Sequence, residues 1–284
     1  MNASPHSNHC STAGSAGVDA LGTQHPLAEK TARIVSLVTS LTELVCGLGM
    51  ADQMVGRTRY CIHPADALRS VPVIGGTKDL DLARLRALAP SHILVNIDEN
   101  KREQVAEVAT FIPHVIVTHP LKPDDNIALF NLIGGIFGRA AQAGKLAAEY
   151  AARLAELRAE MRAVPNESVL YLIWRKPWMT VSRDTYIAAH LAEVGWQTLP
   201  AQDPARYPEV APGAGWLKTV QRVLLSSEPF PFTASHIAEA AALTGLPAAS
   251  IHLVDGEMVS WYGIRAMAGL AYLAGLRRTV AGQC

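Results

Sequence analysis

Side chains able to hold a large ligand are concentrated in the second half of the chain. All five tryptophans follow residue 163, and several stand among basic residues. The group comprises Trp174, Arg175, Trp178, Arg183, Trp261, Tyr262 and Arg265. Aromatic faces beside guanidinium groups suit a large flat or amphipathic ligand with carboxylate or amide edges. Tryptophans also fill gaps between helices and sheets, and we interpret Trp196, after the helix-ending Gly195, in that way.

A glycine pair in the first half offers a second binding element. The run Gly75-Gly76-Thr77-Lys78 resembles part of a phosphate loop, but the G-x-x-x-x-G-K-[ST] spacing is absent, so we exclude nucleotide binding there. Two interpretations stay open. The turn either presents backbone N–H groups and Lys78 to a ligand or is a plain turn.

Three soft donors, Tyr60, Cys61 and His63, lie close together. A resident metal ion needs three or four ligands supported by further hydrogen bonds, so we expect none, with Cys61 and His63 as weak candidates. An axial or edge contact to the metal of a chelate ligand is the favoured alternative. Glu228 directly follows a predicted strand, where it either faces the ligand or caps the next helix.

No residue set typical of catalysis is present. The motifs G-x-S-x-G, H-E-x-x-H and C-x-x-C are absent. Asp98 and Glu99 are adjacent, and we interpret them as helix caps. The sequence therefore predicts a protein that is not an enzyme and carries no covalently attached cofactor.

The elements that position these residues are arranged around one long helix. Residues 139–163 are rich in alanine and place apolar residues along one helical face, with Gly138 before and Pro165 after. Short apolar runs alternate with helical patterns on both sides, which is typical of parallel sheets built from βαβ units. We predict an N-terminal α/β lobe over residues 33–138, a rigid connecting helix over 139–163 and a C-terminal α/β lobe over 164–284.

The expected strands cover residues 33–38, 54–58, 71–78, 92–96, 114–118, 168–174, 222–227 and 250–254. Ligands of open parallel sheets sit beyond the carboxyl ends of the strands, which points to a cleft between the lobes. Residues 1–32 are polar and unpatterned, and we expect them to be disordered. A metal site at His6, His9 and Cys10 within them is not favoured.

Composition limits the partners and the compartment. Lysine plus arginine number 25, as do aspartate plus glutamate, so the net charge gives no indication of nucleic-acid binding. We also expect a monomer. The four cysteines lack paired spacing, which argues against a disulfide framework. No signal-peptide pattern opens the sequence. This favours the cytoplasm, or the periplasm if the true start lies upstream.

Several segments resemble the vitamin B12, haem and siderophore-binding proteins of ABC importers. The resemblance covers residues 33–276, including RIVSLVTSLTELVCGLG, RTRYCIHP, VPVIGGTKDLDLARLRALAPSHILVN, LIWRKPWMTVSRDTYI, LLSSEPFPF and LVDGEMVSWYGIR. RTRYCIHP and the last three resemble, more narrowly, a cobalamin-binding subgroup of helical-backbone metal receptors. The resemblance implies two Rossmann-like lobes joined by one rigid helix, as in class III periplasmic binding proteins. By position, it implies ligand contacts from Thr39, Ser40, Tyr60, Gly76, Thr77, Lys78, Trp174, Arg175, Trp178, Glu228, Trp261, Tyr262 and Arg265.

The chain departs from the importer pattern at the two acids that pair with the permease. Ala83 occupies the first-lobe position, where nearby Asp81 is a possible substitute, and residues 213–223, which match the second-lobe position, contain no acid.

From the resemblance as a whole we expect a non-catalytic receptor for a metal chelate. A corrinoid is favoured over haem or a siderophore, and an ABC permease is a possible partner. The alternatives are a cytosolic chelate-processing or chelatase-like enzyme using Cys61, His63 and Glu228, and a ligand-free scaffold.

Overall fold

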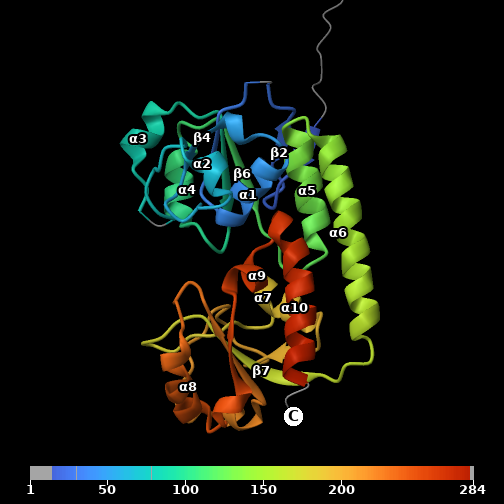
Figure 1. Ribbon diagram of the computed structural model, residues 1–284. Helices are drawn as coiled ribbons and strands as arrows, with labels where there is room; N and C mark the ends of the chain where they lie inside the picture. The colour runs from blue at the N-terminus through green and yellow to red at the C-terminus, as the bar shows by residue number, and fades with distance from the viewer. Residues whose placement is uncertain (1–14, 30, 78, 282–284) are drawn as a thin grey trace, which may run out of the picture.

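Two lobes are stacked end to end along one long helix in the computed structural model of the chain (Figure 1). The structure describes residues 15–29, 31–77 and 79–281. The predicted class, two parallel-sheet lobes joined by a long helix, is confirmed. Among the described helices, none is both long and apolar enough to cross a membrane.

The first lobe is built on a four-stranded sheet in the order β4-β3-β5-β6, with every pairing parallel. Its strands are β3 (Ile34–Ser36), β4 (Met54–Arg57), β5 (His92–Asn96) and β6 (His114–Thr118). Its helices are α1 (Thr39–Gly47), η1 (Ala51–Gln53), α2 (Ala65–Leu68), α3 (Leu82–Ala87), α4 (Arg102–Val108) and α5 (Asp125–Ile136). All five residues of β5 are buried, as expected for a central strand covered on both faces.

The second lobe repeats this plan with a sheet in the order β10-β9-β7-β8, again parallel. Its strands are β7 (Glu167–Leu172), β8 (Trp196–Thr198), β9 (Arg222–Ser226) and β10 (Ile251–Val254). Its helices are α7 (Tyr186–Ala192), η2 (Gly215–Thr219), η3 (Ala234–His236), α8 (Ile237–Thr244), η4 (Ala248–Ser250), α9 (Gly256–Ser260), η5 (Gly263–Arg265) and α10 (Ala266–Ala281). The carboxyl ends of the strands point toward the first lobe, so the loops that follow them line the space between the lobes (Figure 1).

The connecting helix is α6 (Ala140–Met161), which packs on α5 in the first lobe and on α10 in the second. Its buried residues are Ala143, Ala147, Tyr150, Leu154, Leu157 and Met161. The three- and four-residue spacing of this stripe keeps it on one face of the helix, toward both lobes. One apolar core cluster runs from the first lobe through this face into the second.

Three sequence predictions are wrong in detail. Residues 71–78 make only isolated bridges, because Gly75 adopts a φ of +106° and turns the chain. The short strand β8 was missed. Within the range predicted to be disordered, β1 (Ser15–Val18) and β2 (Gln24–Pro26) form a hairpin, anchored because buried Asp19 accepts hydrogen bonds from the backbone N–H of Val117 and Thr23. His6, His9 and Cys10 lie outside the described residues.

Candidate functional site

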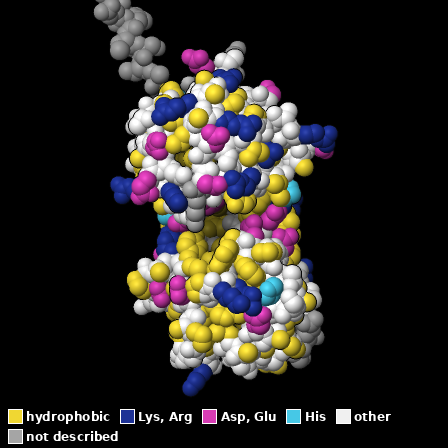
Figure 2. Space-filling model, turned by 90° about the vertical axis from the view of Figure 1, so that its left-hand side faces the viewer, with side chains coloured by type: hydrophobic (Ala, Val, Ile, Leu, Met, Phe, Trp, Pro, Cys, Tyr) yellow, Lys and Arg dark blue, Asp and Glu magenta, His cyan; other side chains and the backbone are white. Residues whose placement is uncertain are grey.

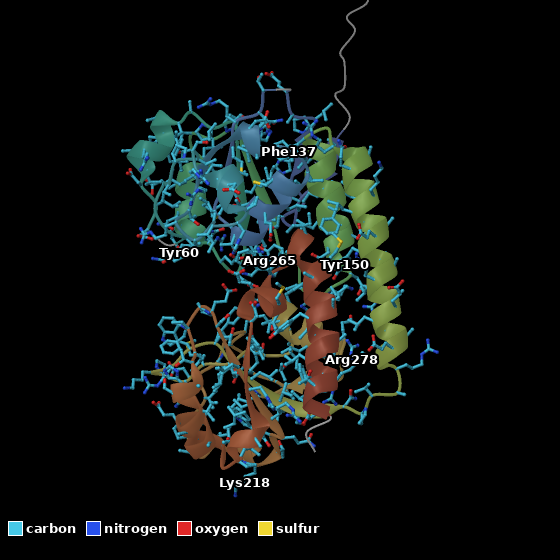
Figure 3. The ribbon with its side chains drawn as sticks, in the orientation of Figure 1. Tyr60, Phe137, Tyr150, Lys218, Arg265 and Arg278 are labelled. Carbon is cyan, nitrogen blue, oxygen red and sulfur yellow. The ribbon has the colours of Figure 1, made fainter. Side chains whose placement is uncertain are left out.

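A hollow separates the two lobes, and hydrophobic side chains gather on its second-lobe wall (Figure 2). The strand-end loops that the sequence predicts as functional border this cleft. On the first-lobe side, Tyr60 lies at the edge facing the second lobe (Figure 3). The cleft therefore has one wall from each lobe.

Partly exposed apolar side chains extend from loops of both lobes. Tyr60 is 52% exposed, Ile62 50% and Ile97 43% in the first lobe, and Trp174 is 40% exposed in the second. Trp174 packs edge-on against Phe230, with ring centroids 5.8 Å apart. Large apolar groups left this exposed on strand-end loops are available to cover a ligand. Ile62 and Ile97 were missed, although their place in strand-end loops was a usable signal.

Trp178 is half-buried and packs against the second-lobe core. Its ring stacks on Phe232, with centroids 5.9 Å apart and an angle of 1° between the planes. Both residues belong to the second-lobe core beside β9. Trp178 therefore supports the wall on which Trp174 stands. Trp196 is fully buried, as predicted.

The glycine pair lies beside Tyr60, which approaches Gly76 closely. A Cβ on Gly76 would lie 3.2 Å from Cε2 of Tyr60 and closer still to Oδ1 of Asp79, so a larger residue here would require both side chains to shift. Thr77 is half-buried beside it, and Lys78 lies outside the described residues. Residues 75–77 therefore form a turn that packs beside the ring of Tyr60.

Thr39 and Ser40, predicted ligand contacts, form the first turn of α1. The cap position is Val38, which makes no side-chain cap bond. Thr39 is half-buried and Ser40 is 3% exposed. Ser40 lies behind the cleft surface, against Gly263 of the second lobe, where a Cβ would be 3.3 Å from the Ser40 carbonyl oxygen.

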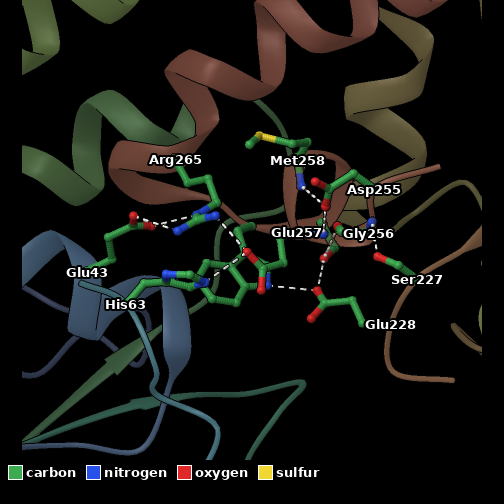
Figure 4. Close-up of polar contacts among 11 residues, drawn as sticks. Glu43, His63, Ser227, Glu228, Asp255, Gly256, Glu257, Met258 and Arg265 are labelled. Atoms are coloured by element: carbon green, nitrogen blue, oxygen red, sulfur yellow. Dashed lines mark hydrogen bonds and ion pairs between the residues drawn. The ribbon is translucent and has the colours of Figure 1, made fainter. Parts of the chain in front are cut away.

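Where the lobes meet, a polar cluster closes the inner end of the cleft (Figure 4). We call it the cleft floor, and it consists of Glu43, His63, Glu228, Glu257, Ser260, Trp261 and Arg265. Arg265 donates to both carboxylate oxygens of Glu43 at 2.8 Å and to Glu257 at 2.6 Å. Nε2 of His63 lies 3.3 Å from the Glu257 carboxylate. Because Glu43 and His63 come from the first lobe, the cleft floor joins the lobes.

Trp261 and Arg265 were predicted ligand contacts, but the protein itself engages most of their surface. Trp261 is only 6% exposed, with the Arg265 guanidinium 4.6 Å from its ring centroid and His63 at its edge. Its indole N–H donates to Glu228 at 2.7 Å. These residues therefore organise the cleft floor and leave little ring surface for a ligand.

Glu228 belongs to the cleft floor and does not cap the next helix. Its Oε1 accepts hydrogen bonds from Ser260 and Trp261, both at 2.7 Å. The capping role at η3 belongs to Thr233 and His236. Burial raises the pKa of Glu228, and the nearby carboxylates of Glu257 and Asp255 act in the same direction. Of the two roles that the sequence left open for Glu228, the structure excludes the helix cap.

A second set of contacts joins the lobes beside the cleft floor. Asp98 accepts a hydrogen bond from Arg206 at 2.8 Å, and Glu99 accepts one from the hydroxyl of Tyr262 at 2.8 Å. Burial raises the pKa of Glu99 to about 7. The expected helix-cap role is wrong for both acids, since α4 begins at Arg102. Tyr262 is 5% exposed and belongs to this contact, so it too offers a ligand little surface.

The proposed metal candidates do not converge. Cys61 is fully buried, with Sγ 3.1 Å from Oγ1 of Thr58, and burial raises the pKa of its thiol. His63 contacts Glu257, whereas Glu228 is bonded to Ser260 and Trp261. Across residues 15–29, 31–77 and 79–281, no group of three or more His, Cys, Asp or Glu side chains is placed to hold a metal ion. The geometry required for the chelatase-like alternative is therefore not formed by Cys61, His63 and Glu228.

Arg175 and Arg183 are engaged by partners within the second lobe. Arg175 donates to both oxygens of Glu239 at 2.6 and 2.7 Å. Arg183 donates to the carbonyl of Thr198 and lines a side pocket of about 490 Å³ with Asp184 and Asp203. The guanidinium groups that suggested carboxylate recognition are thus largely occupied within the chain.

Comparisons with known proteins agree with this architecture. Residues 34–220 match the family model described as periplasmic binding protein. The vitamin B12-binding protein of Photorhabdus laumondii is 23% identical over 187 residues, covering 66% of this chain and 68% of that protein. The periplasmic vitamin B12-binding protein of Vibrio cholerae superposes with a TM-score of 0.77 at 16% identity, covering 88% of this chain and 97% of that one. A periplasmic haem-binding protein from Roseiflexus gives 0.73 at 20% identity, covering 88% and 99%.

Proposed function

Because this chain belongs to the periplasmic binding protein family, we propose that it is a non-catalytic receptor for a bulky metal chelate held between its lobes. A corrinoid is the favoured ligand, followed by haem or a siderophore. The observation that carries the proposal is the set of exposed apolar side chains on strand-end loops of both lobes, Tyr60 and Ile62 in the first lobe and Trp174 in the second. Partly exposed aromatic and aliphatic groups of this kind can cover both faces of a flat macrocycle.

Preorganisation supports the same proposal. The lobes are already joined by the Glu43–Arg265 and Asp98–Arg206 ion pairs and by α6. A receptor with its walls in place loses little conformational entropy when it binds. The bound chelate would then gain most of its affinity from apolar burial between the walls.

We extend the proposal to the solute-binding component of an ABC uptake system. The similarity to a vitamin B12-binding protein and to periplasmic haem-binding proteins supports a small-molecule chelate as ligand. Asp81, the possible substitute for a docking acid, is exposed but uses Oδ1 to cap α3.

A binding titration tests the receptor function. The folded protein is titrated with cobalamin, cobinamide, haemin and a ferric siderophore, and saturable binding to at least one is expected. Trp174→Ala should weaken that binding about tenfold or more, as loss of a central aromatic contact costs more than about 1 kcal/mol. Trp216→Ala is the matched control, because Trp216 lies in η2, at the far end of the second lobe near Lys218 (Figure 3). Absence of saturable binding to all four by folded protein would overturn the proposal.

A further inference from the structure

The arginines around the cleft are neutralised by carboxylates of the chain itself. Arg265 is paired with Glu43 and Glu257, and Arg206 with Asp98. Arg175, beside Trp174, is paired with Glu239. Each of these guanidinium groups is already paired with a carboxylate of the chain. A ligand carboxylate could bind the guanidinium only by displacing that partner, which would leave a carboxylate of the chain without its cation.

Carboxylates, by contrast, are in excess where the lobes meet. Glu228 accepts hydrogen bonds from the neutral groups of Ser260 and Trp261, and Glu99 accepts one from Tyr262. Within the described part of the chain, no ion pair neutralises either acid. Glu228 on the cleft floor and Glu99 beside it are therefore hydrogen-bond acceptors that no cation of the described chain has paired.

Glu228 is held firmly in this position. A Cβ on Gly256 would lie 2.5 Å from Cγ of Glu228 and 2.5 Å from Oγ of Ser226, so only glycine leaves room for this side chain. Ser226 donates to the Glu228 carbonyl at 2.6 Å and accepts from the Tyr171 hydroxyl at 2.9 Å. Both bonds to the carboxylate reach Oε1, and Oε2 is left for a further donor (Figure 4). The geometry is that of a fixed acceptor.

A fixed, partly desolvated carboxylate distinguishes ligands by the chemistry of their edges. A primary amide of the ligand can donate an N–H to Oε2, whereas a ligand carboxylate at the same place brings two negative charges together. Because Glu228 is partly buried, this repulsion is screened less than it would be between groups in bulk water. The distinction is therefore expected to be large.

We propose that the cleft selects metal chelates whose edges carry amide groups over those whose edges carry carboxylates, and that Glu228 is the residue that makes this distinction. The inference rests on the proposed function and narrows its ligand class. It favours an amide-edged corrinoid over a haem, whose edge carries two carboxylates.

The test uses two chelates that share one ring and differ only at its edge. Dicyanocobinamide carries amides, and dicyanocobyrinic acid carries free carboxylates in their place. At pH 7.5 the native protein should bind the amide form at least about tenfold more tightly. Glu228→Gln keeps an oxygen acceptor for Ser260 and Trp261 while removing the charge, and it should reduce the preference at least threefold, mainly by tightening binding of the acid form. Glu156→Gln makes the same change on the exposed face of α6 and should leave the preference unaltered.

The outcomes separate the two proposals. If neither ligand nor haemin binds the folded native protein, the receptor function itself fails. If both forms bind the native protein equally, the receptor function stands and edge selection is overturned. If the native preference persists in a folded Glu228→Gln variant, selection stands but Glu228 is not its source. Thermal unfolding of each variant shows that it is folded before binding is compared.

Discussion

The guanidinium of Arg265 binds the carboxylate of Glu43 through two N–H···O bonds of 2.8 Å, although 222 positions separate the residues in sequence. Such a bidentate ion pair fixes both the distance and the relative orientation of the two side chains, because the guanidinium and the carboxylate must lie in nearly the same plane. Both side chains are less than one-fifth exposed. The pair therefore sets how the η5 segment of the second lobe sits against α1 of the first.

Replacement of Glu43 by glutamine should destabilise the contact between the lobes. The amide cannot accept two charged hydrogen bonds, and we expect the free energy of unfolding to fall by about 1–3 kcal/mol. Glu149→Gln is the matched control, since its pair with Arg153 is about half exposed and should contribute less than about 1 kcal/mol. Urea unfolding followed by circular dichroism measures both. Equal losses in the two variants would contradict a structural role for the Glu43–Arg265 pair.

Asn126 should be more sensitive still, because its amide joins both lobes and the connecting helix. Its Oδ1 accepts from the Gly263 N–H, and its Nδ2 lies 3.0 Å from the hydroxyls of both Tyr150 and Tyr186. Asn126→Ala would leave several of these fully buried polar groups unpaired, so we expect a loss of at least about 2 kcal/mol in the free energy of unfolding.

Asn166→Ala, at an exposed position before β7, should change that free energy by less than about 0.5 kcal/mol. A Tyr150→Phe and Asn126→Ala double-mutant cycle would then measure the coupling between the two side chains. Strictly additive effects would show that the hydrogen bond between Asn126 and Tyr150 contributes nothing to stability.

A histidine cluster at the amino ends of β5 and β6 should make folding sensitive to acid. The rings of His92 and His114 stack with centroids 4.6 Å apart, and His25, paired with Asp19, lies beside His114. Burial, together with the neighbouring His114 and His25, lowers the pKa of His92 from 6.5 to about 4. The unfolded chain therefore binds a proton at His92 over a pH range in which the folded chain does not.

Stability should accordingly be complete above about pH 6.5 and fall as the pH decreases from 6.5 to 4. A shift of this size corresponds to about 3 kcal/mol from His92, and the lowered pKa of His114 adds to it. His92→Gln should flatten the curve of unfolding free energy against pH over this range. An unchanged slope in that variant would assign the acid sensitivity to other groups.

The sequence predicted best those features that depend on local pattern. The strands at residues 92–96 and 114–118 were predicted with the observed bounds, because continuous apolar runs flanked by polar residues mark buried parallel strands. The connecting helix was placed within two residues at each end. The strand predicted at residues 71–78 is wrong because Gly75 turns the chain. Strand β8 was missed because three residues are too few to show a periodic pattern.

The candidate site was predicted less completely, since partners distant in sequence decide which side chains remain available. Arg265 and Tyr262 stand in the right loop, but Glu43 and Glu99 occupy them from the other lobe. Arg175 is likewise occupied by Glu239. A single sequence identifies residues on strand-end loops, but not which of them the folded chain pairs with one another.

The connecting helix should govern the cleft as well as the fold. Leu154 is 2% exposed, and its replacement by glycine both empties a core position and weakens the helix. We expect the free energy of unfolding to fall by about 3–5 kcal/mol. Ala155→Gly, at the adjacent exposed position, introduces the same backbone freedom without a cavity and should cost about 1 kcal/mol.

If α6 holds the lobes in register, Leu154→Gly should also speed amide hydrogen exchange in the loop of residues 97–100, which contacts the second lobe through Asp98 and Glu99. Chelate affinity should fall in the same variant when measured well below its unfolding temperature, because part of the binding energy would then be used to order the walls. Ala155→Gly should leave both quantities near native. A destabilised Leu154→Gly protein with native exchange in that loop and native affinity would reduce α6 to a simple connection between the lobes.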